Sequence, residues 1–182
     1  MSPNAPKVIE VRLTTPHQLF NSFDPAPFQE KDLDRDAEEY IVGWADEVPL
    51  GQPTRLLIHL PTDALALARS LGIEHAVHNY FAYRAAEMGR RLRFLFREGR
   101  VALAIGIAFM IVCVSLRQLA FLVEPETLAH ILQESLLIVG WVALWRPLQI
   151  FLYDWWPIHH RARLFRKLAT VPIDVRGGVE AP

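Results

Sequence analysis

The chain has 182 residues, which fits one modest soluble domain together with a short membrane part. Its formal net charge is −1, which argues against general affinity for nucleic acid. The single cysteine, Cys113, cannot form a disulfide within the chain, and segment 1–16 has no apolar core of signal-peptide length. We therefore do not expect the N-terminal domain to be exported.

Residues 1–73 are predicted to form a small cytoplasmic α/β domain. Segments Val8–Leu13 and Thr54–Leu60 are typical of strands, the first because its apolar and charged residues alternate. A helix is expected between them, opening at Asp32 or Asp34, and a short helix follows the second strand. The order β-α-β-α indicates a parallel pair of strands with a right-handed crossover.

Two strands make a thin sheet with exposed edges. We therefore expect this domain to gain strands or cover from another copy of the chain or from another protein.

Residues 74–100 are predicted to form a basic helical neck that continues into the membrane. Arginines near its membrane end can contact anionic headgroups, and they can equally serve only to set the topology. The second interpretation is favoured, because the positive-inside rule, by which loops rich in Lys and Arg stay cytoplasmic, already accounts for these arginines. The headgroup-contacting candidates are Arg90, Arg91, Arg93, Arg97 and Arg100.

Residues 101–153 are predicted to form a transmembrane helical hairpin, with spans at about 101–123 and 128–153. The turn contains Pro125, and the second span is expected to bend at Pro147. Small residues at helical spacing suit close helix packing, either within the hairpin or between copies. They are Ala102, Gly106, Ala104, Ala108 and Gly140.

Two charges near the turn are expected at nearly the same depth. Arg117 lies eight residues before Pro125, and Glu134 lies nine residues after it. The two side chains either form an ion pair near the outer leaflet or reach the headgroups separately.

Residues 154–182 are predicted to form an interfacial amphipathic helix and a tail, with a loose end from Val175. Basic residues flank both spans and are absent from the turn, which places both termini in the cytoplasm. The residues expected at the cytoplasmic membrane interface are Arg146, Asp154, Trp155 and Trp156.

No motif in the chain carries a catalytic or cofactor prediction. His75, His78, His159 and His160 fall on the cytoplasmic side, but no cysteine or paired-acid spacing completes a zinc site, so no metal is predicted. Acidic residues between Asp24 and Asp36 lack the glycine and terminal glutamate of a calcium loop. These acidic residues are better explained as the solvent-exposed first turn of a helix, where the helix dipole favours negative charge.

The segment Trp145–Pro157, WRPLQIFLYDWWP, resembles one found in an uncharacterised family of bacterial membrane proteins with two spans. The segment Tyr80–Arg84 with the arginine-rich run that follows it is also similar. This resemblance implies a setting in the bacterial inner membrane. It implies no activity and no site residues.

Three functions stay open. The first is an interaction protein, acting as a scaffold or accessory subunit held at the inner membrane by the hairpin, which the thin sheet and the absent catalytic motifs favour. The second is a self-assembling pore or transport path, favoured by intramembrane charges such as Arg117, Glu134 and Arg146. The third, an enzyme at the membrane surface, has no residues to support it.

Overall fold

The computed structural model describes residues 6–119 and 125–178. It divides into two compact units. The head unit comprises residues 1–88 and 160–182, and the hairpin unit comprises residues 89–159. Residues 120–123 of the predicted first span and residues 179–182 of the predicted tail lie outside the described part. The C-terminal segment therefore groups with the N-terminal domain.

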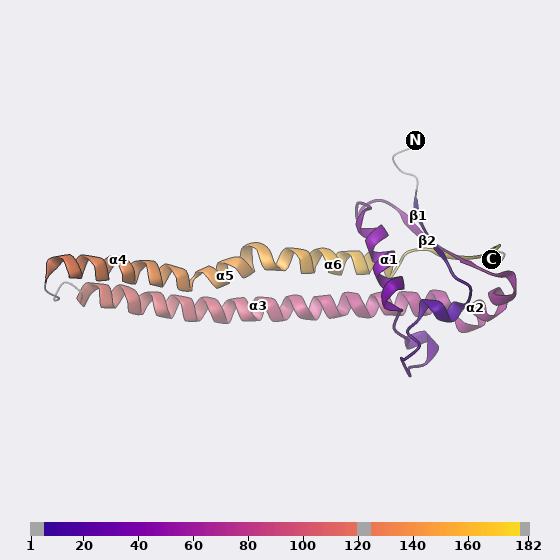
Figure 1. Ribbon diagram of the computed structural model, residues 1–182, viewed down its shortest axis with the longest axis horizontal. Coiled ribbons are helices and arrows are strands. Elements are labelled where there is room, and N and C mark those ends of the chain that lie inside the picture. The colour runs from indigo at the N-terminus through magenta and orange to yellow at the C-terminus, as the bar shows by residue number, and fades with distance from the viewer. Residues whose placement is uncertain (1–5, 120–124, 179–182) are drawn as a thin grey trace. The chain divides into compact units, whose positions relative to one another are not determined.

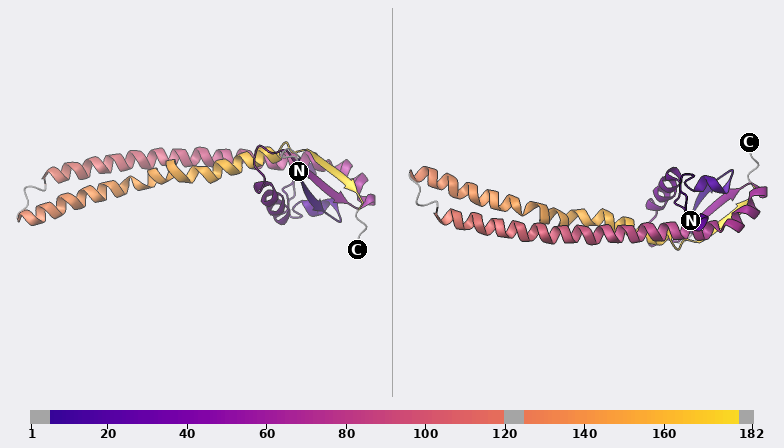
Figure 2. Two further views of the ribbon diagram at one scale, coloured as in Figure 1. Left: turned by 90° about the horizontal axis from the view of Figure 1, so that it is seen from above. Right: turned by 90° about the horizontal axis from the view of Figure 1, so that it is seen from below.

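The head unit contains a parallel sheet of three strands in the order β1-β2-β3 (Figures 1 and 2). The strands are β1 (Lys7–Arg12), β2 (Thr54–Leu60) and β3 (Ile173–Gly177). The parallel pairing of the first two strands is confirmed. The third strand comes from the segment predicted as a loose end, so that prediction is wrong for residues 175–177.

The C-terminal strand supplies the cover that we expected from another molecule. The backbone N–H of Leu56 donates to the carbonyl of Pro172 at 2.9 Å. Val171 is 3% exposed and Ile173 is 8% exposed, so burial holds this segment in place. The second edge of β2 is thus paired within the same chain.

Short helices complete the head. Helix α1 (Arg35–Asp46) begins after Asp34, whose side chain accepts the N–H of Asp36 as predicted for a cap. Helix α2 (Leu65–Leu71) follows a 3₁₀ turn at Thr62–Ala64. It ends at Gly72, whose positive φ of 67° suits glycine.

Helix α6 (Trp155–Leu168) confirms the predicted amphipathic helix but not its place at the membrane surface. Its apolar residues Leu164, Phe165 and Leu168 are buried in the head. The ring of Phe165 stacks on that of Phe81, with 6.1 Å between centroids. The apolar residues of the C-terminal half of this helix are therefore covered by protein.

The hairpin unit is built from two helical arms that lie side by side (Figures 1 and 2). The first arm belongs to α3 (Ile73–Leu119), a single helix that contains both the predicted neck and the described part of the first span. The second arm comprises α4 (Glu126–Ala143), α5 (Trp145–Gln149) and a π-helical turn, η5 (Ile150–Asp154), before α6. Two long apolar helices packed as a hairpin are thus confirmed.

The two arms meet along a seam of small residues. Gly99, Gly106 and Cys113 are buried at intervals of seven residues along α3, the spacing of a left-handed coiled coil. A Cβ on Gly106 would lie 3.0 Å from the carbonyl oxygen of Ala143, and one on Gly140 would lie 3.3 Å from the Cβ of Cys113. Gly106 and Gly140 therefore pack within the hairpin.

The second arm is interrupted near Pro147, about one turn earlier than the predicted bend. Proline has no N–H, so the carbonyl of Ala143 lacks its usual helical donor. Helix α4 ends at that residue, and Leu144 serves as its C-terminal cap. The same Ala143 carbonyl lies against Gly106, which ties the interruption to the seam.

We expect Gly106→Ala to destabilise the protein by about 1–3 kcal/mol, although alanine favours helix more than glycine does. The added Cβ would lie 2.9 Å from Leu144 Cδ2 and 3.0 Å from a backbone oxygen, so the arms must separate. Gly89→Ala in the same helix is the control, because its nearest neighbour is 3.9 Å away. Thermal unfolding in mild detergent measures both, and equal stability of the two variants would contradict the seam.

Candidate functional site

A cluster of three charges lies in the hairpin unit. The guanidinium of Arg146 donates to Asp154 at 2.8 Å and to Glu98 on α3 at 3.1 Å. Two of these residues, Arg146 and Asp154, were predicted as interfacial, and Glu98 was not. The three side chains are 37–53% exposed, so in water each pair would contribute at most about 1 kcal/mol. The cluster joins the two arms beside the π-helical turn.

Aromatic side chains surround this cluster. The indole N–H of Trp155 donates to the carbonyl of Phe151 at 3.0 Å, and Phe96 stacks on Phe151 with 6.2 Å between centroids. Trp156 and Tyr153 are 68% and 70% exposed. Trp155 therefore packs inside the hairpin, whereas Trp156 and Tyr153 face outward, as residues of an interfacial belt would.

The other predicted site residues are exposed. The register of the arms, in which Gly106 meets Ala143 and Gly140 meets Cys113, places Arg117 and Glu134 at the same level. Both of these side chains face outward, and their ion pair stays a prediction. Headgroup contact by the neck also stays a prediction. The neck arginines exposed on α3 are Arg90, Arg91, Arg93, Arg97 and Arg100.

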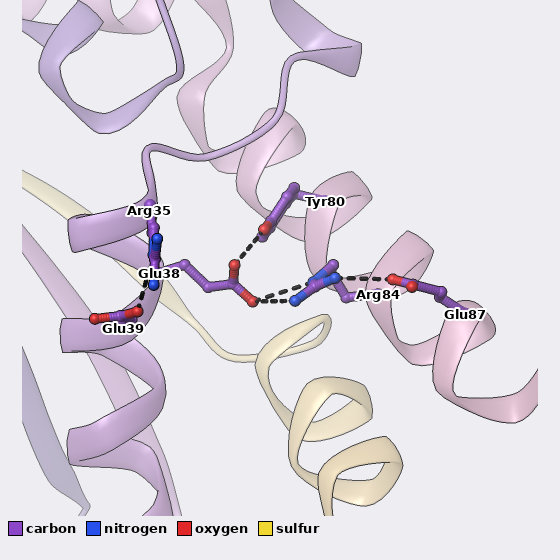
Figure 3. Close-up of polar contacts among 6 residues, drawn as sticks. All are labelled: Arg35, Glu38, Glu39, Tyr80, Arg84 and Glu87. Carbon is purple, nitrogen blue, oxygen red and sulfur yellow. Dashed lines mark hydrogen bonds and ion pairs between the residues drawn. The ribbon is translucent and has the colours of Figure 1, made fainter. Parts of the chain in front are cut away.

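The head contains a polar network that the sequence did not reveal (Figure 3). The carboxylate of Glu38 on α1 accepts the hydroxyl of Tyr80 at 2.7 Å. Its other oxygen accepts two N–H groups of Arg84, at 2.9 and 3.1 Å. Arg84 also donates to Glu87 at 2.8 Å, and its guanidinium lies 5.4 Å from the ring centre of Phe165. We call these residues, Glu38, Tyr80, Arg84 and Glu87, the clamp.

The surroundings of Tyr80 and Arg84 hold the charge states of these two clamp residues. Burial raises the pKa of Tyr80, and its hydrogen bond to Glu38 raises that pKa further, so the phenol stays a neutral donor. Burial opposes the charge on Arg84, but hydrogen bonding and attraction to Glu38 outweigh it and raise the pKa of the guanidinium. Neither the Tyr80 phenol nor the Arg84 guanidinium therefore has a proton poised for transfer near neutral pH. The clamp is a structural tie between α1 and α3.

A cavity of about 380 Å³ lies beside the clamp, lined by Glu30, Asp32, Asn79, Tyr80 and Tyr83. Burial raises the pKa of Asp32, and the nearby charge of Asp24 adds to the effect. Asp24 accepts the backbone N–H groups of Asp32 and Ala26, which lowers its own pKa. Asp24 therefore organises the loop before α1.

Comparison with known proteins returns no relatives. A scan against family models, a search of curated proteins and a search of solved structures each gave no match.

Two of the histidines considered as ligands have partners of other kinds. His78 Nε2 lies 2.8 Å from the carbonyl oxygen of Val171, and His160 Nε2 lies 2.7 Å from Asp46 Oδ1. Within residues 6–119 and 125–178, no group of three or more His, Cys, Asp or Glu side chains is arranged to hold a metal ion. These two histidines join segments of the head.

Proposed function

We propose that the chain is an integral protein of the bacterial inner membrane, whose hairpin anchors a cytoplasmic head that serves as an interaction module, a scaffold or accessory subunit. The observation that carries this proposal is the large apolar surface that the hairpin leaves uncovered. Side chains exposed by 50% or more include Val101, Ile105, Ile111, Val112, Leu119, Ile131, Ile138, Trp141, Val142 and Trp145.

Such a surface needs a cover other than water. The long helical segments Ile73–Leu119 and Glu126–Leu168 each contain an apolar stretch of 18 residues, of which 17% are buried. A core helix of a soluble protein, by contrast, is mostly buried. The apolar part of α3 from residue 101 to 119 would extend about 28 Å, close to the roughly 30 Å of a bilayer core. Lipid is therefore the cover that fits both composition and length.

The distribution of basic residues supports the orientation. The exposed arginines between residues 90 and 100 precede the first span, and the turn near Pro125 has no basic residue. The rule that basic flanks stay inside favours a cytoplasmic head and cytoplasmic termini.

The interaction role is favoured over the two alternatives. A pore needs a polar lining, and segment 101–114 of the first span carries no charged or hydrogen-bonding polar side chain except the thiol of Cys113. The charges that favour a pore, Arg117, Glu134 and Arg146, lie toward the ends of the spans. A groove of about 380 Å³ on the second arm is apolar and suits an acyl chain or another helix. It is lined by Leu137, Ile138, Trp141, Val142, Trp145 and Leu148. An enzyme would need a poised proton donor or nucleophile, and neither Tyr80 nor Arg84 of the clamp is one.

Cysteine labelling tests the anchor. In a Cys113→Ala background, Thr127→Cys at the turn and Ser70→Cys on the head place one exposed thiol each. We expect an impermeant maleimide to label position 127 in intact spheroplasts, and position 70 only after the membrane is opened. Labelling of position 70 in intact spheroplasts, or recovery of the chain in the soluble fraction, would refute the topology.

Native mass spectrometry and flux measurements test the role. From membranes solubilised in mild detergent, we expect the chain together with a different protein, and reconstituted liposomes should stay impermeable to ions. A large symmetric homo-oligomer that conducts ions would overturn the interaction role in favour of the pore.

A further inference from the structure

A row of three basic side chains crosses the head sheet near the carboxyl ends of its strands. Arg12 on β1 is the register partner of His59 on β2, and His59 is the register partner of Arg176 on β3. Paired residues of parallel strands point to the same face of the sheet. Arg12, His59 and Arg176, here called the basic row, therefore lie side by side.

The basic row lies on the open face of the sheet. The opposite face is the one that is buried, with Ile9, Ile58 and Ile173 among its core residues. Arg12 and Arg176 are exposed, and His59 between them is half-buried. A ligand can therefore reach the arginines from solvent.

Neighbouring acids balance the charges of the basic row only in part. Asp174 on the same face is taken by Arg55, at 2.8 Å. Glu10 Oε2 lies 3.5 Å from His59 Nε2, within ion-pair distance but without hydrogen-bond geometry, so Glu10 faces the middle of the row. Among the residues that the structure describes, the guanidinium groups of Arg12 and Arg176 form no ion pair.

His59 adds a second sign of an unfilled site. Its Nε2 is shielded from solvent and has no hydrogen-bond partner within the described residues. A buried polar atom without a partner is costly and rare in folded proteins.

We propose that the basic row binds a phosphate-type anion. Arg12 and Arg176 lie on either side of His59, two strand spacings of about 4.8 Å apart, so an anion placed between them could contact both guanidinium groups. Arginine presents paired N–H donors that match phosphate oxygens. The anion belongs either to a soluble phosphorylated molecule or to a lipid headgroup. This inference does not rest on the anchoring role of the hairpin.

Calorimetric titration of the full chain in zwitterionic detergent tests the site. Inorganic phosphate is the first probe, and short-chain phosphatidic acid is the second. Saturable binding of both with similar affinity assigns the site to soluble phosphate ligands, whereas at least about tenfold tighter binding of the lipid assigns it to a headgroup. Absence of saturable binding for both probes overturns the proposal.

Variants locate the binding. We expect Arg12→Gln and Arg176→Gln each to weaken phosphate binding about tenfold or more, because each removes a charge-assisted contact. Arg35→Gln, which removes the same charge from an exposed pair on α1, is the control and should change affinity less than about twofold. If the row variants bind as tightly as the Arg35→Gln protein, the site does not exist. Circular dichroism verifies that each variant is folded.

Discussion

A chain that ends at Thr170 is expected to lose its folded head. The truncation removes β3 together with the buried side chains of Val171 and Ile173 and exposes the second edge of β2. Burial of two such side chains contributes about 3–6 kcal/mol before the lost ladder hydrogen bonds are counted. A whole domain is stable by only about 5–15 kcal/mol, so little stability would remain.

Limited proteolysis measures this loss in membranes that contain the full chain or the truncated chain. We expect trypsin to cut rapidly at Arg55, which lies in β2, only in the truncated chain. A chain that ends at Gly178 is the control, because it keeps every residue of β3. Equal protection of the two truncated chains would mean that β3 does not hold the head together.

Glu38→Ala is expected to destabilise the head by about 2–3 kcal/mol. Glu38 and Arg84 are 18% and 27% exposed, so the change leaves a mostly buried guanidinium without its main partner. The hydroxyl of Tyr80 loses its acceptor at the same time. Thermal or urea unfolding of the full chain in detergent, followed by circular dichroism, gives the difference in unfolding free energy.

The next residue along α1 provides a matched control. Glu39 pairs with Arg35 at 3.2 Å, but these side chains are 67% and 86% exposed (Figure 3). We expect Glu39→Ala to cost less than about 0.5 kcal/mol, the usual contribution of an exposed pair one helical turn apart. A similar loss in both variants would show that the clamp contributes no more than a surface ion pair.

Local sequence patterns were sufficient for most helices and for two strands. Segment Thr54–Leu60 was predicted with its observed bounds, because a short apolar run between prolines is typical of a buried strand. Strand β3 was missed because IDVRG is short and its burial depends on β2, which is far away in the sequence. The clamp was missed for a related reason, since an acid in the first turn of a helix is expected whether or not it has a distant partner.

The hairpin shows the same limit. The sequence pattern predicts small residues at the helix contact through pairs spaced by four, whereas the buried seam follows the seven-residue interval of Gly99, Gly106 and Cys113. Ala104 and Ala108 of those pairs face outward. Arg146 and Asp154 were identified from their position at the end of a span, whereas their contact with Glu98 depends on the register of the arms. Register is a tertiary property that spacing along one helix does not reveal.

If the hairpin crosses a membrane as proposed, the late position of β3 makes closure of the sheet depend on insertion of both helices. Arg55 and Asp174, which pair across β2 and β3, are 119 residues apart, so the ribosome makes the hairpin before the sheet can close. On the proposed topology, β3 returns to the cytoplasm only when both helices cross the bilayer. A chain with one inserted helix would leave β3 on the far side and an open β2 edge in the cytoplasm. Quality-control proteases could then remove that chain by recognising its incomplete head.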